Sequence, residues 1–333
     1  MLRIDFTAED LGRLRVAGEP DPLWEITLSL HLLQNRQAAV VFDPWRREVR
    51  AGLARAGLTA TTTALTRLVP SAAYFPDFLT PGQGTAPDLH TGIELVLSTP
   101  RRRLAAELAQ LCPRGPVPPL VRRLAEGDPR ALQGLGGALR RYYAIAVEPY
   151  RPAVREAVRA DRSVRSDAAL RAGPDGLLRS YGPALTWESR TLTAPYPHPR
   201  DLPLDGRPLT IVPSFFCVLM PVTLADDGLD PVLVHPLGPA PGWLARARAQ
   251  GRLGAADLPV GQLIGPTRAL VLDALEQPRT TTQLAELLRL TMSTASRHAT
   301  VLREAGLVIS ERRGHEVFHV RTGLGDALMD GAL

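Results

Sequence analysis

The sequence predicts an α+β protein, in which a helix-rich N-terminal domain with a small β-sheet precedes a C-terminal domain of helices and a β-hairpin. In the first half of the chain an Asp-Pro pair repeatedly opens an apolar run, a pattern typical of a capped helix that begins with proline. Between Leu177 and Leu237 the apolar runs are short and are interrupted by Pro and Gly, which indicates strands. After Pro266 clear helical and then strand-like patterns follow.

The N-terminal elements are predicted from their first residues. Residues 1–6 alternate apolar and charged side chains, as a short strand does. Thr7 can cap a helix whose first turn carries acidic residues. Three further helices are expected, each opened by an Asp-Pro pair, over residues 21–33, 43–58 and 128–143.

The strands of the small sheet are expected in three apolar runs, over residues 184–193, 208–218 and 231–235. The Pro- and Gly-rich stretch 236–242 then has the composition of a linker. Three parts of the chain follow: an effector or dimerisation domain over 1–240, with a second boundary near 165–177 left open, a linker over 241–257, and a C-terminal domain over 258–333.

The C-terminal domain is predicted element by element. A first helix is expected over residues 266–276, and Thr280 begins a capping box for a second helix that runs to Leu288. Thr291 can cap a third helix over 292–305, which a glycine then ends. Two β-like runs make a hairpin over 307–321, with a turn at residues 312–315. This order of helices and hairpin is that of a winged helix-turn-helix.

The helix over 292–305 has the two faces that are needed to read DNA. Four side chains three and four positions apart form an apolar stripe: Met292, Ala295, Ala299 and Leu302. The opposite side carries short polar side chains, which fit the major groove, and Arg297, which can contact a guanine with two hydrogen bonds. We therefore expect this helix to be the recognition helix.

The hairpin over 307–321 is expected to be the wing, with arginines at its tip that suit phosphates or the minor groove. An ordinary solvated turn is the alternative for the tip. The DNA contacts predicted from helix and wing together are Thr291, Ser293, Thr294, Ser296, Arg297, His298, Thr300, Arg312, Arg313 and His315.

The charge of the chain permits an anionic partner without requiring one. The formal net charge is +5, and all 39 basic residues are arginine. From Val260 onward the sequence contains eight arginines and eight acidic residues, so the C-terminal domain is formally neutral. One copy should bind DNA weakly, and a dimer would double the phosphate contacts.

No metal, cofactor or catalytic motif is present in the sequence. Cys112 and Cys217 are the only cysteines, and they are too far apart for a zinc motif. The histidines at 31, 90, 198 and 235 lack the spacing of metal ligands. The loop 81–85 lacks the lysine of a phosphate loop, and there is no Gly-x-Ser-x-Gly. We expect no metal, no cofactor and no enzymatic activity.

Targeting and membrane signals are also missing from the sequence. The N-terminus is charged and has no long apolar run, unlike a signal peptide. The most apolar stretch, residues 211–225, is too short to span a bilayer and contains two prolines. We expect a soluble, cytoplasmic protein without membrane contact.

Residues 291–308, from the cap of the third helix to the first strand of the hairpin, closely resemble the recognition-helix segment of ArsR-type winged-helix repressors. The likeness covers about residues 258–322. The whole chain also resembles long actinobacterial regulators of this type, which carry an N-terminal domain of uncharacterised role. The resemblance implies a homodimer that binds an inverted-repeat operator in double-stranded DNA, usually represses, and is released by an effector. It also implies dimer contacts from the helix at 265–276 and the tail at 323–333.

The sequence departs from the pattern of the ArsR family at three places. Arg289 stands where the turn often has Gly, so a left-handed backbone there would cost about 1 kcal/mol. Ala299 stands where Leu is usual, which thins the core under the recognition helix. The metal-sensing members have Cys-x-Cys in the second helix, and residues 281–288 contain neither Cys nor His. Metal sensing through that site is therefore not expected.

Three functions remain open from the sequence. The first is a DNA-binding transcriptional repressor whose N-terminal domain senses a small molecule or dimerises. The second is a winged helix used for protein assembly without DNA binding, which the thin basic surface allows. The third is an enzyme with a regulatory winged helix. Aromatic side chains that could line an effector pocket, or simply fill the core, include Trp24, Trp45, Tyr74, Phe75, Phe78, Tyr142, Tyr143, Trp187, Phe215 and Phe216.

Overall fold

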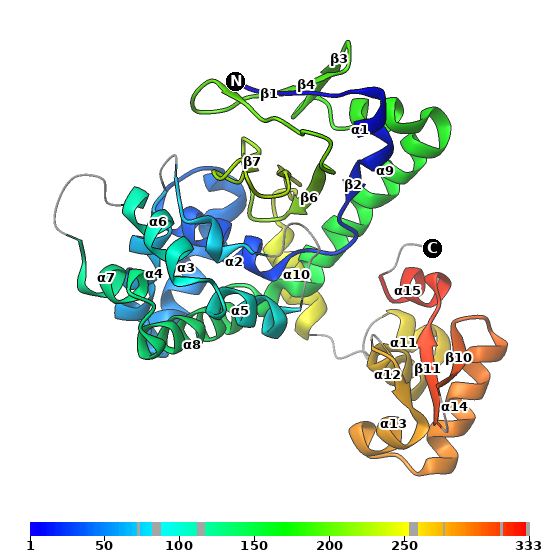
Figure 1. Ribbon diagram of the computed structural model, residues 1–333. Coiled ribbons are helices and arrows are strands. Elements are labelled where there is room, and N and C mark those ends of the chain that lie inside the picture. The colour runs from blue at the N-terminus through cyan, green and yellow to red at the C-terminus, as the bar shows by residue number, and fades with distance from the viewer. Residues whose placement is uncertain are drawn as a thin grey trace. The chain divides into compact units, whose positions relative to one another are not determined.

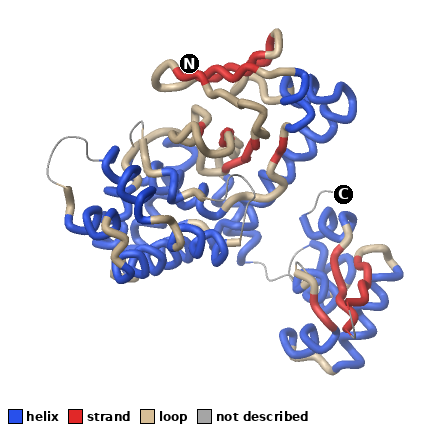
Figure 2. Tube along the Cα trace, viewed as in Figure 1, coloured by secondary structure: helices blue, strands red, loops and turns tan. Residues whose placement is uncertain are grey.

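A computed structural model describes residues 1–71, 74–81, 88–111, 117–252, 259–275, 277–313 and 316–330. Contacts within the chain divide it into two compact units, Met1–Leu244 and Ala245–Leu333, which Figure 1 traces. Cys112, Glu276, His315 and most of the loop 81–85 lie outside the described residues. The predicted α+β class is confirmed, because helices dominate both units and the strands form small sheets (Figure 2).

The N-terminal unit is mainly helical. Its helices are α1 (Ala8–Arg13), α2 (Pro22–Gln34), α3 (Ala39–Arg55), α4 (Thr59–Leu68), α5 (Leu89–Leu97), α6 (Arg101–Leu111), α7 (Pro119–Ala125), α8 (Pro129–Ala146) and α9 (Arg151–Arg179), with short 3-10 helices η1 (Asp77–Leu79) and η2 (Glu148–Tyr150). Helix α2 is the central one, since ten of its side chains are buried and it contacts α3, α4, α5 and α8.

Three of the predicted helix starts are found with the expected caps. Thr7 and Asp10 form a capping box at the start of α1. Asp21 accepts the backbone N–H of Leu23 at 2.9 Å, and Asp128 accepts that of Arg130 at 2.8 Å. Each cap satisfies backbone donors that a helix start otherwise leaves unpaired, and this explains why the helices begin where they do.

The helix predicted to begin at Asp43-Pro44 begins earlier, and that prediction was wrong. Helix α3 starts at Ala39, after Ala38 in the left-handed conformation, and Pro44 lies inside the helix. Asp43 does not cap the helix; instead it accepts a hydrogen bond at 2.7 Å from Arg46, one turn further on. The local Asp-Pro pattern was therefore overridden by the buried contacts of this helix, which include Phe42 and Trp45.

The strands of the N-terminal unit form two small sheets, where the sequence predicted one. The first has the order β3-β4-β1-β5 and the second the order β2-β6-β8-β7. Their strands are β1 (Leu2–Asp5), β2 (Arg15–Val16), β3 (Thr186–Glu188), β4 (Thr191–Ala194), β5 (Arg200–Asp201), β6 (Thr210–Ser214), β7 (Val222–Thr223) and β8 (Val232–Pro236). In both sheets a strand from the first 16 residues pairs with strands from the region after residue 186.

The region 165–177, where a second domain boundary was left open, lies within α9. This helix is kinked at Ala172 and Gly173, followed by Pro174, and residues on both sides of the kink belong to the same unit. The stretch 241–257, expected to be a linker, contains α10 (Trp243–Arg252). Trp243 is buried in the N-terminal unit, where its indole N–H donates to the carbonyl of Val41 at 3.0 Å. The first residues of the expected linker are therefore part of the N-terminal core.

The C-terminal unit consists of short helices and a three-stranded sheet of order β10-β11-β9. Its elements are α11 (Pro259–Ile264), α12 (Pro266–Ala274), β9 (Arg279–Thr280), α13 (Thr281–Leu288), α14 (Met292–Glu304), β10 (Val308–Arg313), β11 (Glu316–Arg321) and α15 (Gly323–Asp330). Leu272, Leu284, Ala295 and Leu302 pack together in one core, which joins α12, α13 and α14. Within the described part of the chain, no helix is both long and apolar enough to cross a membrane.

Candidate nucleic-acid interface

The interface is built on the turn between α13 and α14. Thr280 and Gln283 form the predicted capping box, which fixes the start of α13. Arg289 ends α13 in the left-handed conformation, with φ 52° and ψ 42°. Thr291 then caps α14 by accepting the backbone N–H of Thr294 at 3.2 Å. The short connection orients α14 against α13 as a helix-turn-helix requires.

The apolar side of α14 is nearly as predicted. Ala295, Ala299 and Leu302 are buried under the helix. Met292 was expected in the same stripe, but its side chain is 50% exposed. Met292 occupies the first position of the helix, and its side chain lies outside the core into which the other three side chains pack. The buried stripe is therefore one turn shorter than the sequence indicated.

The opposite side of α14 presents short polar side chains and one guanidinium. Ser293, Ser296 and Arg297 are exposed, whereas Thr294 and Thr300 are half-buried. The exposed Thr291 hydroxyl lies 3.1 Å from that of Ser293 and 2.7 Å from that of Thr294. The first turn of α14 thus carries a chain of three hydroxyls, whose free lone pairs and protons can face a groove or a phosphate.

His298 lies at the edge between the two sides of α14. It is half-buried, and its Nδ1 has no hydrogen-bond partner among the described residues. Burial lowers the pKa of His298, and the nearby guanidiniums of Arg268 and Arg297 lower it further. His298 is therefore neutral at physiological pH and adds no positive charge to this surface.

The hairpin of β10 and β11 has an uninterrupted antiparallel register, from Val308 opposite Arg321 to Arg313 opposite Glu316. Arg312 is exposed near the tip, beside Val317 on the neighbouring strand. For Arg313 the backbone pairing alone is described, and His315 lies outside the described residues. The hairpin thus brings a basic side chain close to its turn.

His319 was not predicted as part of this region, although it joins the wing to the helices. Its imidazole lies 3.0 Å from the hydroxyl of Thr281 in the first turn of α13 and 2.9 Å from that of Ser310 in β10. The side chain is buried, and burial lowers its pKa. The alternation of the strand gives no signal for this role, because Val317, two residues away on the same face, is 45% exposed, and a lone histidine does not identify its partners.

Comparison with known proteins agrees with this geometry. Residues 263–311 match the family described as "Helix-turn-helix domain", a stretch that covers all of α12, α13 and α14 and the first part of β10. No curated protein and no solved structure matches the chain. The chain therefore contains a helix-turn-helix domain of the kind that DNA-binding transcriptional regulators use, and this points to a regulator rather than an enzyme.

Proposed function

We propose that this protein is a sequence-specific, dimeric transcriptional repressor of the ArsR type. Helix α14 enters the major groove, the hairpin of β10 and β11 acts as the wing, and the N-terminal unit senses a small molecule. The observation that carries the proposal is the exposed face of Ser293, Ser296 and Arg297 on a helix whose other face is buried in a helix-turn-helix core. Such a face is free to meet base edges.

The roles of individual side chains follow from their positions. Arg297 reads a guanine, since it is the one long basic side chain on the outer face of α14 that lies in the N-terminal half of the helix. Thr291, Ser293, Thr294, Ser296 and Thr300 contribute hydroxyls to bases or phosphates, and His298 lies at the margin of the contact. Arg312, Arg313 and His315 approach the backbone or the minor groove from the wing.

Dimer formation is supported by apolar side chains on the first and last helices of the C-terminal unit. Leu263 of α11 is 73% exposed and Leu324 of α15 is 48% exposed. Helix α15 lies in the tail at 323–333 from which the resemblance implies dimer contacts, whereas α11 directly precedes the helix implied at 265–276. Burial of these two large apolar side chains per copy would favour association. An inverted-repeat operator matches such a two-fold arrangement.

A gel-shift experiment tests the proposal most directly. The full chain is titrated onto DNA from upstream of its own gene and onto a shuffled duplex of the same length, at two salt concentrations. A sequence-specific regulator shifts the upstream DNA more tightly, and both affinities fall as salt rises. A chain that shifts neither duplex at either salt concentration is not a DNA-binding regulator, and the helix-turn-helix would then serve protein assembly.

A further inference from the structure

The N-terminal unit contains a cavity of about 250 Å³. Leu28, His31 and Leu32 of α2 line it, together with residues of the segment 216–225. The residues that line it come from elements far apart in the sequence, and Glu25 of the same helix holds the backbone of Phe215 and Phe216 in place at 2.9 and 3.1 Å. The cavity is thus built on a buried and well-bonded frame.

The inner surface of the cavity is mixed, because the polar side chains of Asn35, Gln37 and Ser71 line it beside apolar and aromatic ones. Leu28 and Leu32 line it together with the rings of Phe75, Tyr196 and Phe216. Phe75 packs edge-on against Trp24 and His31, with ring centroids 6.0 and 5.4 Å apart. Aromatic side chains beside polar ones favour a ligand that combines a ring with a polar group, because aromatic side chains pack well against another ring.

Two buried polar atoms of the cavity wall have no partner among the described residues, the Nε2 atom of His31 and the hydroxyl of Thr223. Burial lowers the pKa of His31 to about 4, and its imidazole is hydrogen-bonded to the carbonyl of Pro70. A carbonyl accepts only from an N–H, so the proton sits on Nδ1 and Nε2 is left as an unpaired acceptor. A ligand that donates a hydrogen bond would satisfy this acceptor, which is costly to leave unpaired.

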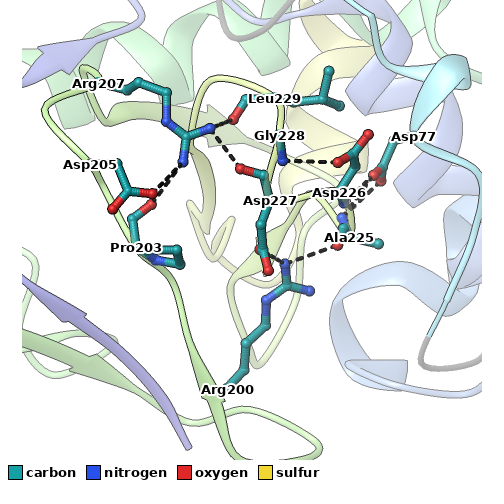
Figure 3. A network of polar contacts seen from close by, with 10 residues as sticks. All are labelled: Asp77, Arg200, Pro203, Asp205, Arg207, Ala225, Asp226, Asp227, Gly228 and Leu229. Atoms are coloured by element: carbon teal, nitrogen blue, oxygen red, sulfur yellow. Dashed lines mark hydrogen bonds and ion pairs between the residues drawn. The ribbon is translucent and has the colours of Figure 1, made fainter.

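The charged groups at the cavity are already paired within the protein (Figure 3). Asp77 accepts the backbone N–H groups of Ala225 and Asp226 at 2.8–3.0 Å. Arg200 donates to the carboxylate of Asp227 at 2.7 Å and to the carbonyl of Ala225 at 3.2 Å. A charged ligand would have to leave water for a site whose charges already have partners, which is unfavourable.

We infer that this cavity binds a neutral, flat aromatic molecule with a hydroxyl group, and that the hydroxyl donates to Nε2 of His31. The inference deepens the proposed sensing function of the N-terminal unit, because it names the class of effector and its site. Binding itself requires no DNA, so it is measured independently of the repressor function.

Four probes with the same ring system test the ligand class, by equilibrium binding to the full chain at neutral pH. They are 2-naphthol, naphthalene, 2-naphthoate and 2-naphthylmethylammonium. We expect 2-naphthol to bind about tenfold more tightly than naphthalene, as one hydrogen bond to a buried acceptor contributes. Both charged probes should bind more weakly than 2-naphthol. Equal binding of 2-naphthol and naphthalene, or tighter binding of either charged probe, would overturn the inference.

Variants locate the binding site. His31→Phe keeps an aromatic ring but removes the acceptor, so 2-naphthol should bind it no more tightly than naphthalene. The matched control is His90→Phe, since the His90 side chain is exposed on α5. Unchanged preference for 2-naphthol in a folded His31→Phe protein would contradict the assignment. The comparison of probes on the wild-type chain stands without any variant, should His31→Phe fail to fold.

A gel shift with and without 2-naphthol separates this inference from the proposed repressor function. Tight 2-naphthol binding by a chain that does not shift DNA supports the cavity and counts against the repressor. DNA binding by a chain that does not prefer 2-naphthol supports the regulator and overturns the assigned ligand class.

Discussion

The hydroxyl of Ser214 donates to the carboxylate of Glu25 at 2.9 Å, which joins the end of strand β6 to the buried helix α2. The same carboxylate accepts the backbone N–H groups of Phe215 and Phe216. Glu25 is fully buried, so the stability of its charged carboxylate inside the protein depends strongly on these three hydrogen bonds.

Replacement of Ser214 by alanine should lower the free energy of unfolding by about 1–3 kcal/mol, because it leaves a buried carboxylate with one donor fewer. Chemical denaturation of the full chain measures the change. Ser163→Ala is the matched control, since Ser163 is exposed on α9 and its loss should change stability by less than about 0.5 kcal/mol. Equal effects of the two substitutions would show that the bond to Glu25 contributes nothing.

Stability should also depend on pH through Glu25. Burial raises the pKa of Glu25 from 4.5 to about 7, against the effect of its three hydrogen bonds. The folded protein therefore holds this proton more strongly than the unfolded chain does. The resulting stabilisation is complete below pH 4.5 and is lost as the pH rises through about 7, with a total of about 3 kcal/mol.

The Glu25→Gln variant lacks this titration, so its free energy of unfolding should fall less between about pH 4.5 and 7 than that of the wild type. Burial raises the pKa of Asp21 and Asp77 to about 6 in the same direction, but both proteins share those groups. Glu156→Gln, at an exposed position of α9, should keep the wild-type pH dependence. Parallel curves for wild type and Glu25→Gln would refute the role of Glu25.

Glycine at position 289 should stabilise the C-terminal unit. Arg289 has φ 52°, and a left-handed backbone costs a residue with a Cβ about 1 kcal/mol that glycine avoids. Thermal unfolding of Arg289→Gly should give a higher midpoint for this unit. Arg303→Gly removes the same side chain from the last turn of α14, where no left-handed strain is relieved, and should not raise the midpoint. A lower midpoint for both variants would mean that the strain at residue 289 is negligible.

Arg297→Ala should reduce sequence preference more than general DNA affinity. A bidentate contact to guanine accounts for about 1–3 kcal/mol of discrimination, and that discrimination is lost when the guanidinium is removed. Competition binding with specific and shuffled duplexes measures it. Arg303→Ala is the control, because Arg303 is exposed in the last turn of α14. Intact operator preference in Arg297→Ala would exclude Arg297 from base reading.

The wing should contribute affinity that does not depend on sequence. Arg312→Ala combined with Arg313→Ala removes two cations that would meet phosphates, so binding to every duplex should weaken. The slope of log affinity against log salt should become less steep by about one unit per lost contact. An unchanged salt slope would remove the wing from the DNA contacts.

Helix starts were predictable where a single residue and its next turn decide them. Thr7, Asp21, Asp128, Thr280 and Thr291 all cap the helices they were expected to cap. Their side chains bind backbone N–H groups two or three residues away, so nothing distant is needed. Asp43-Pro44 carries the same local signal, but there the contacts of Phe42 and Trp45 with the core extend the helix backwards.

The sheets were not predictable in this way, because their pairs join opposite ends of the N-terminal unit. Leu2 lies opposite Ala194, and Arg15 lies opposite Thr210. Strands β2 and β7 have two residues each, too few for any periodic pattern. For the candidate interface, the buried and exposed faces of α14 followed from helical spacing, whereas the link through His319 depends on three elements that meet in space.

The imidazole of His319 fixes the position of the β10–β11 hairpin relative to helix α13. It joins strand β11 to Thr281 at the start of α13 and to Ser310 in the other strand of the hairpin. The hairpin and the helices α13 and α14 should consequently move as one rigid body. A DNA duplex whose groove does not match the fixed positions of α14 and the hairpin would have to deform on binding. Such a domain would therefore discriminate between duplexes by their stiffness as well as by their bases.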